Sequence, residues 1–211
     1  MTETVKKQPP RRRRKEARPG EIIDAGLKEF SQNGLAATRL EDVAKRAGIA
    51  KGTIYRYFDS KEDLFVAAIR SRIVHSMNDV HIAIDHFEGP TDELLRMVLG
   101  KIYSEFIGTD TSALMRILIS EGNRFPNLVK LYHAEAISKG MSILTRIVER
   151  GVSRGEFRDG PAIAEPRILI APAIMAALWH STFQVHDPLP IERFIEAHID
   201  TLLYGLMKKI E

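Results

Sequence analysis

The feature that most constrains this chain is the segment of residues 38–62, where one glycine separates two short helical patterns. Thr38, with Glu41 three residues later, predicts a capping box at the start of the first helix. Gly48 predicts its end, since glycine readily takes the left-handed conformation that terminates helices. The first helix is expected to bury small and apolar side chains that let two helices cross closely: Val43, Ala44 and Ala47. The segment therefore predicts a helix-turn-helix.

The second helix of the pair is expected over residues 50–58, with two opposite faces. Helical spacing places Ile54 and Phe58 on the side that packs against the first helix. The opposite side, called here the recognition face, holds two cations, a glycine and an aromatic hydroxyl: Lys51, Gly52, Tyr55 and Arg56. Cations attract phosphates, and the start of such a helix enters the major groove. This face predicts contact with duplex DNA.

Each candidate DNA-binding residue takes a role from its position. Three side chains are expected to reach base edges, beside a glycine that lets the backbone approach closely: Thr53, Tyr55, Arg56 and Gly52. Four more are expected to reach phosphates, one of them at a helix N-terminus: Lys51, Tyr57, Lys61 and Thr38. Three positions keep alternatives. Arg39 is a phosphate ligand or a solvated surface charge. Tyr55 and Tyr57 are DNA ligands or core residues, and Tyr57 is the nearer of the two to the buried side.

Three motifs follow one another in this segment: Ala47-Gly48-Ile49, Lys51-Gly52-Thr53-Ile54-Tyr55-Arg56-Tyr57-Phe58 and Ser60-Lys61-Glu62. In residue type and order, residues 18–65 resemble the N-terminal DNA-binding domain of the TetR family of bacterial regulators. Many members have serine where this chain has Ala50, a change that removes a phosphate contact without breaking the helix. The resemblance implies a three-helix DNA-binding domain, a helical effector-binding domain, a homodimer and, as the usual activity, repression.

Charge divides the chain into a basic front and a mildly acidic back. Residues 1–61 hold 15 Lys and Arg against 8 Asp and Glu, whereas residues 62–211 hold 16 against 20. Residues 1–16 are densely basic with almost nothing apolar to bury, which predicts a disordered arm attracted to a polyanion. We expect a helix-turn-helix DNA-binding domain over residues 17–62 and a helical ligand-binding and dimerisation domain over residues 63–211.

Helical periodicity continues along the chain and alternating strand patterns are missing, which predicts an all-α fold. The first helix is expected to end at Gly34, and Ser60 with Asp63 predicts a second capping box. An apolar stripe marks the first helix: Ile22, Ile23, Leu27 and Phe30. Further helices are expected over residues 91–107, 111–121, 126–150, 161–185 and 190–209. Pro166 and Pro172 predict that the fourth of these is kinked or begins later.

What the sequence lacks disfavours several classes of function. There is no cysteine, and no two of the seven histidines have the i, i+4 spacing of a helical metal site. We therefore expect no metal and no cofactor, and the sequence offers no recognisable catalytic motif, so we expect no enzyme. The basic start lacks the apolar stretch of a signal peptide, and no apolar run is long enough to cross a bilayer. A cytoplasmic protein without a membrane partner is expected.

Aromatic and methionine side chains in the back of the chain are candidates to line a ligand cavity. They are Tyr103, Phe106, Met115, Tyr132, Met141, Met175, Trp179 and Phe183. The alternative is that each simply belongs to the domain core, which is the ordinary place for such residues. A cavity lined in this way would take a small-molecule effector that is largely apolar.

The last two helical segments predict a homodimer. Residues 168–183 are apolar on nearly every side, so their own domain can cover only part of that surface. Together with the apolar stripe of residues 191–206, they would form a four-helix interface about a two-fold axis. That symmetry would match two half-sites of a palindromic operator. The alternative is that both helices are the interior of a monomer.

Three functions compete at this point. The first is a sequence-specific transcription regulator, a repressor that a small-molecule effector releases from its operator. The second is a DNA-binding spatial or structural regulator on the same fold, controlled by a protein partner. The third is a helical enzyme with an incidental basic tail. An apolar pocket in the back domain would favour the first function, and a filled core would favour the second.

Overall fold

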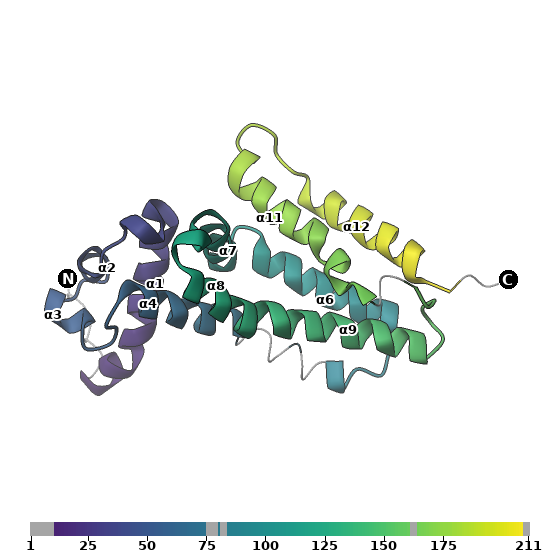
Figure 1. Cartoon of the computed structure of the whole chain (residues 1–211), viewed down its shortest axis with the longest axis horizontal. Helices are drawn as coiled ribbons and strands as arrows, with labels where there is room; N and C mark the ends of the chain where they lie inside the picture. The colour runs from purple at the N-terminus through teal and green to yellow at the C-terminus, as the bar shows by residue number, and fades with distance from the viewer. Residues whose placement is uncertain (1–10, 75–79, 81–83, 161–163, 209–211) are drawn as a thin grey trace, which may run out of the picture. The chain divides into compact units, whose positions relative to one another are not determined.

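The computed structural model describes residues 11–74, 80, 84–160 and 164–208. The chain divides into two compact units, Met1–Ala68 and Ile69–Glu211, called here the N-terminal and C-terminal units. Within the described ranges both are helical, and the extended pairing is confined to an isolated bridge between Phe157 and Met207 (Figure 1). The expected all-α fold is confirmed. None of the described helices is long and apolar enough to cross a membrane.

Four helices make the N-terminal unit or run out of it: α1 (Arg11–Ala37), α2 (Leu40–Arg46), α3 (Lys51–Ile54) and α4 (Lys61–Ile69). Gly34 interrupts α1 with a φ of 76°, so regular helix stops where the sequence predicted. The predicted disordered arm differs from the structure. Residues 11–16 belong to α1, and the rest of that arm lies outside the described residues.

The core of the N-terminal unit joins all four helices. The rings of Phe30 on α1 and Phe65 on α4 meet edge to face, with centroids 5.4 Å apart. Close approach of these helices depends on Gly26, because a Cβ there would lie 2.7 Å from the Leu64 side chain. Other side chains that are almost fully buried come from every helix: Ile22, Leu27, Val43, Ala44, Ile54 and Ala68. The sequence periodicity had placed most of them inside.

The two predicted capping boxes have different outcomes. The Ser60 cap is confirmed, since its hydroxyl oxygen accepts the Asp63 N–H at 3.0 Å. The Thr38 box is wrong, because Arg39 occupies the N-cap position of α2 and no side chain caps it. The Thr38 hydroxyl is buried and instead donates to the Gly34 carbonyl at 2.7 Å. The Thr38 hydroxyl thus donates to a carbonyl beside the break in α1 and accepts from no amide at the start of α2.

The C-terminal unit is built around α6 (Thr91–Phe106). The helix α9 (Ser138–Ser153) lies along one side of α6, with α11 (Ala171–Phe183) and α12 (Ile191–Leu206) on the other (Figure 1). The elements α8 (Pro126–Tyr132) and η3 (His133–Ile137) lead into α9 as one continuous helical run. Shorter pieces complete the unit: η1 (Arg70–Val74), α7 (Asp110–Glu121), η2 (Gly122–Arg124) and η4 (Pro166–Leu169). Of these, η1 and η3 are π-helical.

The helices expected in this unit are confirmed to within a few residues. The segment expected over residues 126–150 is continuous helix, with a π-helical turn in its middle. The prolines of the next segment delay its start, as predicted. Pro166 opens a 3-10 turn, and Pro172 lies in the first turn of α11, where its missing N–H costs nothing. Residues 161–163 lie outside the described residues.

Close packing around Phe157 gives a stability prediction. A Cβ on Gly151 of α9 would lie 2.3 Å from the buried Phe157 ring, so we expect Gly151→Ala to lower the free energy of unfolding by about 1–3 kcal/mol. Gly100 of α6 is the matched control, because a Cβ there meets nothing within 4 Å. Gly100→Ala should leave that free energy unchanged or raise it by about 0.5–1 kcal/mol. Urea unfolding followed by circular dichroism measures both, and equal effects would contradict the packing argument.

Candidate nucleic-acid interface

The recognition face lies on α3 and the turn that continues it. Regular helix covers only Lys51–Ile54, which is shorter than the expected residues 50–58. The turn that follows extends to Phe58, because the amides of Tyr57 and Phe58 both donate hydrogen bonds to the Ile54 carbonyl. Ile54 is fully buried and Phe58 is 9% exposed. All four residues of the recognition face are exposed, as the helical spacing predicted: Lys51, Gly52, Tyr55 and Arg56. Thr53 and Tyr57 are half-buried at its edges.

The turn between α2 and α3 sets the angle at which this face is presented. Gly48 has a φ of 66°, in the left-handed region, and the Ile49 amide donates back to the Ala44 carbonyl at 3.0 Å. A residue with a Cβ is strained in that conformation. The predicted break at Gly48 is therefore confirmed, together with its physical reason.

Glu41, which the sequence placed in a capping box, connects α2 to the recognition face. The carboxylate of Glu41 accepts a hydrogen bond from the Tyr55 hydroxyl at 2.8 Å and pairs with the Lys51 ammonium at 2.9 Å. The hydrogen bond from Lys51, followed by one from backbone and one from Tyr55, lowers the pKa of Glu41 to about 2. The same carboxylate raises the pKa of Lys51 and of Tyr55.

Two residues expected to bind phosphate have hydrogen-bond partners inside the domain, and their contact with DNA stays a prediction. The Lys61 ammonium donates to the Ala36 carbonyl at 2.6 Å and to the Thr38 carbonyl at 3.2 Å. It therefore ties the start of α4 to the link between α1 and α2. The hydroxyl of Thr38 is buried against Gly34. Arg39 is exposed at the start of α2, which leaves its role as a phosphate ligand a prediction.

A second polar link fixes α2 against α1. Glu29 is 7% exposed, and its carboxylate receives the Arg46 guanidinium at 2.6 Å and the Asn33 amide at 2.8 Å. Arg46 also donates to the Gln32 side chain at 2.5 Å. A carboxylate in such a site is stable only with partners, so this cluster holds the two helices in one register.

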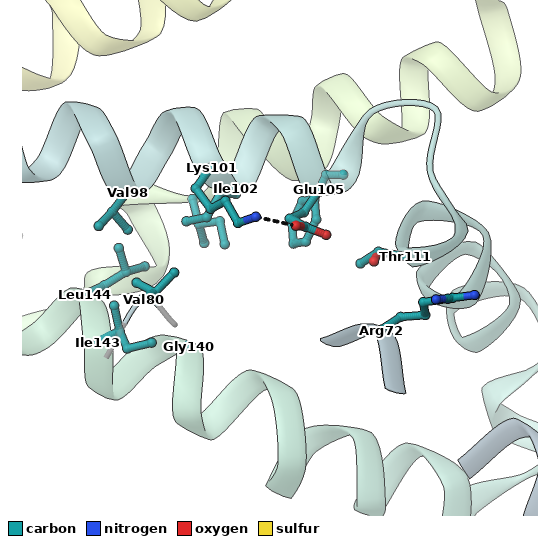
Figure 2. A pocket seen from close by; sticks show the side chains of 12 residues that line it. Arg72, Val80, Val98, Lys101, Ile102, Glu105, Thr111, Gly140, Ile143 and Leu144 are labelled. Carbon is teal, nitrogen blue, oxygen red and sulfur yellow. Dashed lines mark ion pairs between the residues drawn. The ribbon is translucent and has the colours of Figure 1, made fainter. Parts of the chain in front are cut away.

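The C-terminal unit contains a cavity of about 90 Å³. Figure 2 shows its mostly aliphatic wall, with side chains of α6 directed toward those of α9. Its lining residues come from η1, α6, α7, α9 and the segments beside them: Arg72, Val80, Val98, Lys101, Ile102, Glu105, Phe106, Thr111, Gly140, Ile143, Leu144 and Ile170. The lining residues of α6 are spaced three and four apart and so form one stripe on that helix. The sequence prediction considered aromatic and methionine residues and therefore missed this mostly aliphatic stripe.

Of the eight side chains expected to line a cavity, Phe106 lies at this one. Three others sit in the folded interior. Tyr103 is buried with its hydroxyl 2.9 Å from His198 Nδ1, Met115 is buried, and Met141 packs against the main core cluster. Burial raises the pKa of Tyr132 to about 12. For these residues the core alternative describes the surroundings better than the cavity did.

The remaining three follow the outer side of α11. Met175 is 40% exposed and Phe183 is 48% exposed. Trp179 stacks at a tilt on Phe183, with ring centroids 4.8 Å apart, and its indole N–H donates to the Asp187 carbonyl. These positions are four residues apart, so they form one apolar stripe on a helix. The buried side chains of α11 are all small: Ala173, Ala176 and Ala177.

The cations at the cavity are held by carboxylates. Lys101 Nζ lies 2.8 Å from Glu105 Oε1 (Figure 2), and Arg72 Nε lies 3.5 Å from Asp110 Oδ2. A ligand in the cavity would therefore make mainly apolar contacts with its aliphatic wall. In the described part of the chain, no three His, Asp or Glu side chains are grouped so that they could hold a metal ion.

Comparison with known proteins accounts for both units. Residues 22–68 match the family described as bacterial regulatory proteins, tetR family, and residues 88–202 match the tetracyclin repressor-like C-terminal domain. The chain belongs to the TetR family. It is therefore a DNA-binding transcription regulator, and the resemblance seen in the sequence is confirmed across both units.

Individual relatives of this TetR-family protein cover most of its length. The fatty acid metabolism regulator protein of Bacillus subtilis is 27% identical over 192 residues, which span 90% of this chain and 95% of that protein. An HTH-type transcriptional repressor of Streptomyces coelicolor is 27% identical over 161 residues, 76% of this chain and 77% of that one. The structure of FadR from Bacillus subtilis in complex with stearoyl-CoA superimposes with a TM-score of 0.71 at 23% identity, covering 88% of this chain and 98% of that one.

The contacts of Lys61 predict a structural role for its ammonium. Lys61→Ala should lower the free energy of unfolding by about 1–2 kcal/mol, because it removes charge-assisted hydrogen bonds to two carbonyls. Lys45→Ala, at an exposed position of α2, removes the same charge and should leave stability nearly unchanged. Urea unfolding compares the two variants. If Lys61→Ala unfolds like the wild type yet binds every DNA sequence more weakly, Lys61 is the phosphate ligand that the sequence predicted.

Proposed function

We propose that this TetR-family protein is a repressor that binds an operator through the recognition face and is released by a small-molecule effector in the C-terminal unit. The observation that carries the proposal is the mostly aliphatic cavity between α6 and α9. A filled core would have favoured the alternative of a spatial or structural regulator controlled by a protein partner. The name of the Streptomyces coelicolor relative supports repression.

On DNA, the proposed roles divide along the recognition face. Thr53, Tyr55 and Arg56 read base edges, and Gly52 lets the backbone approach. Lys51 and Arg39 reach phosphates from the two helices of the motif, with Tyr57 at the margin. The exposure of Lys51, Tyr55 and Arg56 supports these assignments.

For the effector, we propose a molecule with an apolar chain. The wall formed by Val98, Ile102 and Ile143 favours burial of hydrocarbon, since each buried methylene contributes about 0.8 kcal/mol. Lys101 and Arg72 are already held by carboxylates. The Bacillus subtilis relative named as a fatty acid metabolism regulator, and FadR bound to stearoyl-CoA, support a fatty-acyl compound as the first candidate.

The chain itself offers a route from effector to DNA-binding helices. The helix α4 ends at Ile69, and η1 follows at Arg70 without a break. Arg72 of η1 lines the cavity and pairs with Asp110 of α7. An occupant that displaces Arg72 therefore acts on the segment that directly continues α4. Arg70 of the same π-helical turn pairs with Glu135 of η3 at 3.5 Å, so two adjacent π-helical turns would respond together.

We further propose a homodimer that binds a palindromic operator. In the apolar stripe of α11, Met175 is 40% exposed and Phe183 is 48% exposed, with the half-buried Trp179 between them, and exposed apolar side chains that lie together favour burial against a partner. A second copy related by a two-fold axis would cover it. This proposal reassigns these three residues from a ligand cavity to a subunit interface.

The effector proposal predicts that stearoyl-CoA releases the protein from its operator, whereas coenzyme A without an acyl chain does not. Gly140→Leu places a larger side chain on the cavity wall, so it should bind the operator normally and need at least about tenfold more stearoyl-CoA for release. Gly100→Leu, outside the cavity, is the matched control. Fluorescence anisotropy of a labelled operator duplex measures release. Equal release by coenzyme A, or an unchanged response of Gly140→Leu, would contradict an apolar effector in this cavity.

The dimer proposal predicts that Phe183→Glu dissociates the protein, because a charge cannot be buried unpaired in an apolar interface. Light scattering should give twice the chain mass of 23.8 kDa for the wild type and the single mass for the variant. Ile119→Glu, at a 61% exposed apolar position on α7, should remain dimeric. A wild type that scatters as a single chain at micromolar concentration would remove the dimer and the palindromic operator with it.

A further inference from the structure

The carboxylate of Glu41 contacts two residues of the recognition face, Lys51 and Tyr55, and the packing of a helix-turn-helix does not itself require these contacts. One oxygen, Oε1, receives both the Tyr55 hydroxyl at 2.8 Å and the Lys51 ammonium at 2.9 Å. Glu41 belongs to the first turn of α2, whereas both partners belong to α3 and the turn after it. The contact therefore joins the two helices of the motif on their outer side.

An anion at this place affects the approach of DNA. The Lys51 side chain is 68% exposed, so a DNA phosphate can reach it. To bind that phosphate, the Lys51 ammonium must either break its ion pair with Glu41 or contact both anions at once. Its attraction to any phosphate backbone is reduced by the neighbouring negative charge, and that attraction is the sequence-independent part of binding. Since the pKa of Glu41 is lowered to about 2, its carboxylate stays ionised at neutral pH.

The same contact has a different effect on a residue placed to read bases. Tyr55 is 43% exposed, and its ring would otherwise sample several rotamers on the surface. A hydrogen bond to Glu41 holds the hydroxyl in one place before DNA arrives. Ordering a side chain in advance removes part of the conformational-entropy cost of the binding step. A site that matches the held position gains from this order, and a mismatched site does not.

We propose that Glu41 is a specificity-determining residue, which holds Tyr55 in position for base reading while it restrains Lys51 from binding phosphates of arbitrary sequence. Glu41 acts through its two partners and is a positioning residue. The inference rests on the proposed function to the extent that Tyr55 and Lys51 face DNA. It adds that an acidic side chain, which weakens binding to DNA in general, improves the discrimination between operator and random sequence.

Two substitutions separate the charge of Glu41 from its hydrogen bond. Glu41→Gln removes the charge and keeps an oxygen for Tyr55, so random DNA should bind more tightly and discrimination should fall several-fold. The slope of log affinity against log salt on random DNA should become steeper by about 1, as expected for one more phosphate contact. Glu41→Ala also frees Tyr55 and should lower discrimination further, by about tenfold relative to the wild type.

Asp42→Asn is the matched control, because it removes one negative charge from the same turn of α2 at an exposed position next to Glu41. Its effect on discrimination should stay within about twofold. Binding is measured without effector, on a duplex selected from a random pool by the wild type and on a random duplex of equal length. Thermal unfolding of each variant establishes that α2 and α3 remain folded.

Each outcome decides between the alternatives. Discrimination in the order wild type, Glu41→Gln, Glu41→Ala, with a steeper salt slope for the first variant, supports the inference. An unchanged ratio of operator to random affinity in both variants overturns it, and so does an equal change in Asp42→Asn. Loss of all binding together with a lowered melting temperature assigns Glu41 a purely structural role and overturns it as well. A wild type that selects no sequence contradicts the proposed function first, and this inference falls with it.

Discussion

The burial of Ile54 and Phe58 beneath a very short helix is the constraint on which the DNA-binding surface depends. A helix of four residues has no independent stability, because forming the first turn costs more than a few hydrogen bonds return. Tertiary packing must therefore hold α3, and it does so from one side only. Because Ile54 is fully buried, helical geometry places Lys51, Tyr55 and Arg56 on the opposite, solvent-exposed side. The chemistry of the surface follows from the packing of the core.

The left-handed turn at Gly48 and the polar links around α2 complete this arrangement. Gly48 decides where α2 stops, and Glu29 with Arg46 fixes α2 against α1. Lys61 then ties the beginning of α4 to the preceding link. Residues that carry charge in this unit thus serve two purposes. Some hold helices together, and others, such as Arg56, remain exposed for a partner. A cation count alone does not separate the two groups.

Sequence periodicity predicted the parts of the fold that depend on neighbours along the chain. The buried side of α3, the break at Gly34 and the Ser60 cap all follow from residues three or four apart. The hydrogen bonds that changed the site are of another kind. Glu41 and Tyr55 are 14 residues apart, and Lys61 is 25 residues from Ala36. Such contacts depend on how the helices cross, which a helical pattern does not contain. They give Thr38 and Lys61 partners inside the domain, and the contact of these two residues with DNA stays a prediction.

The cavity illustrates the same limit in the C-terminal unit. Its helices were predicted almost completely, but nothing in the sequence pattern distinguishes Val98, Ile102 and Ile143, which line the cavity, from other aliphatic residues of these helices. Whether an aliphatic side chain meets another one or an open space depends on the spacing of α6 and α9. Conversely, Met175 and Phe183 read as lining of a cavity and are exposed on α11. An apolar residue in the sequence predicts that its side chain is covered. Whether the domain core, a ligand or another subunit covers it depends on the arrangement of the helices.

Mapping all genomic DNA bound by the wild type and by Tyr55→Ala tests the central claim, that the face held outward by Ile54 and Phe58 reads a specific sequence. The account predicts a small set of sites for the wild type that share one inverted-repeat motif. It predicts loss of that motif for Tyr55→Ala, whose fold should remain intact by circular dichroism. A wild type that binds without a shared motif, or a variant that recovers the same motif with equal occupancy, would contradict the account.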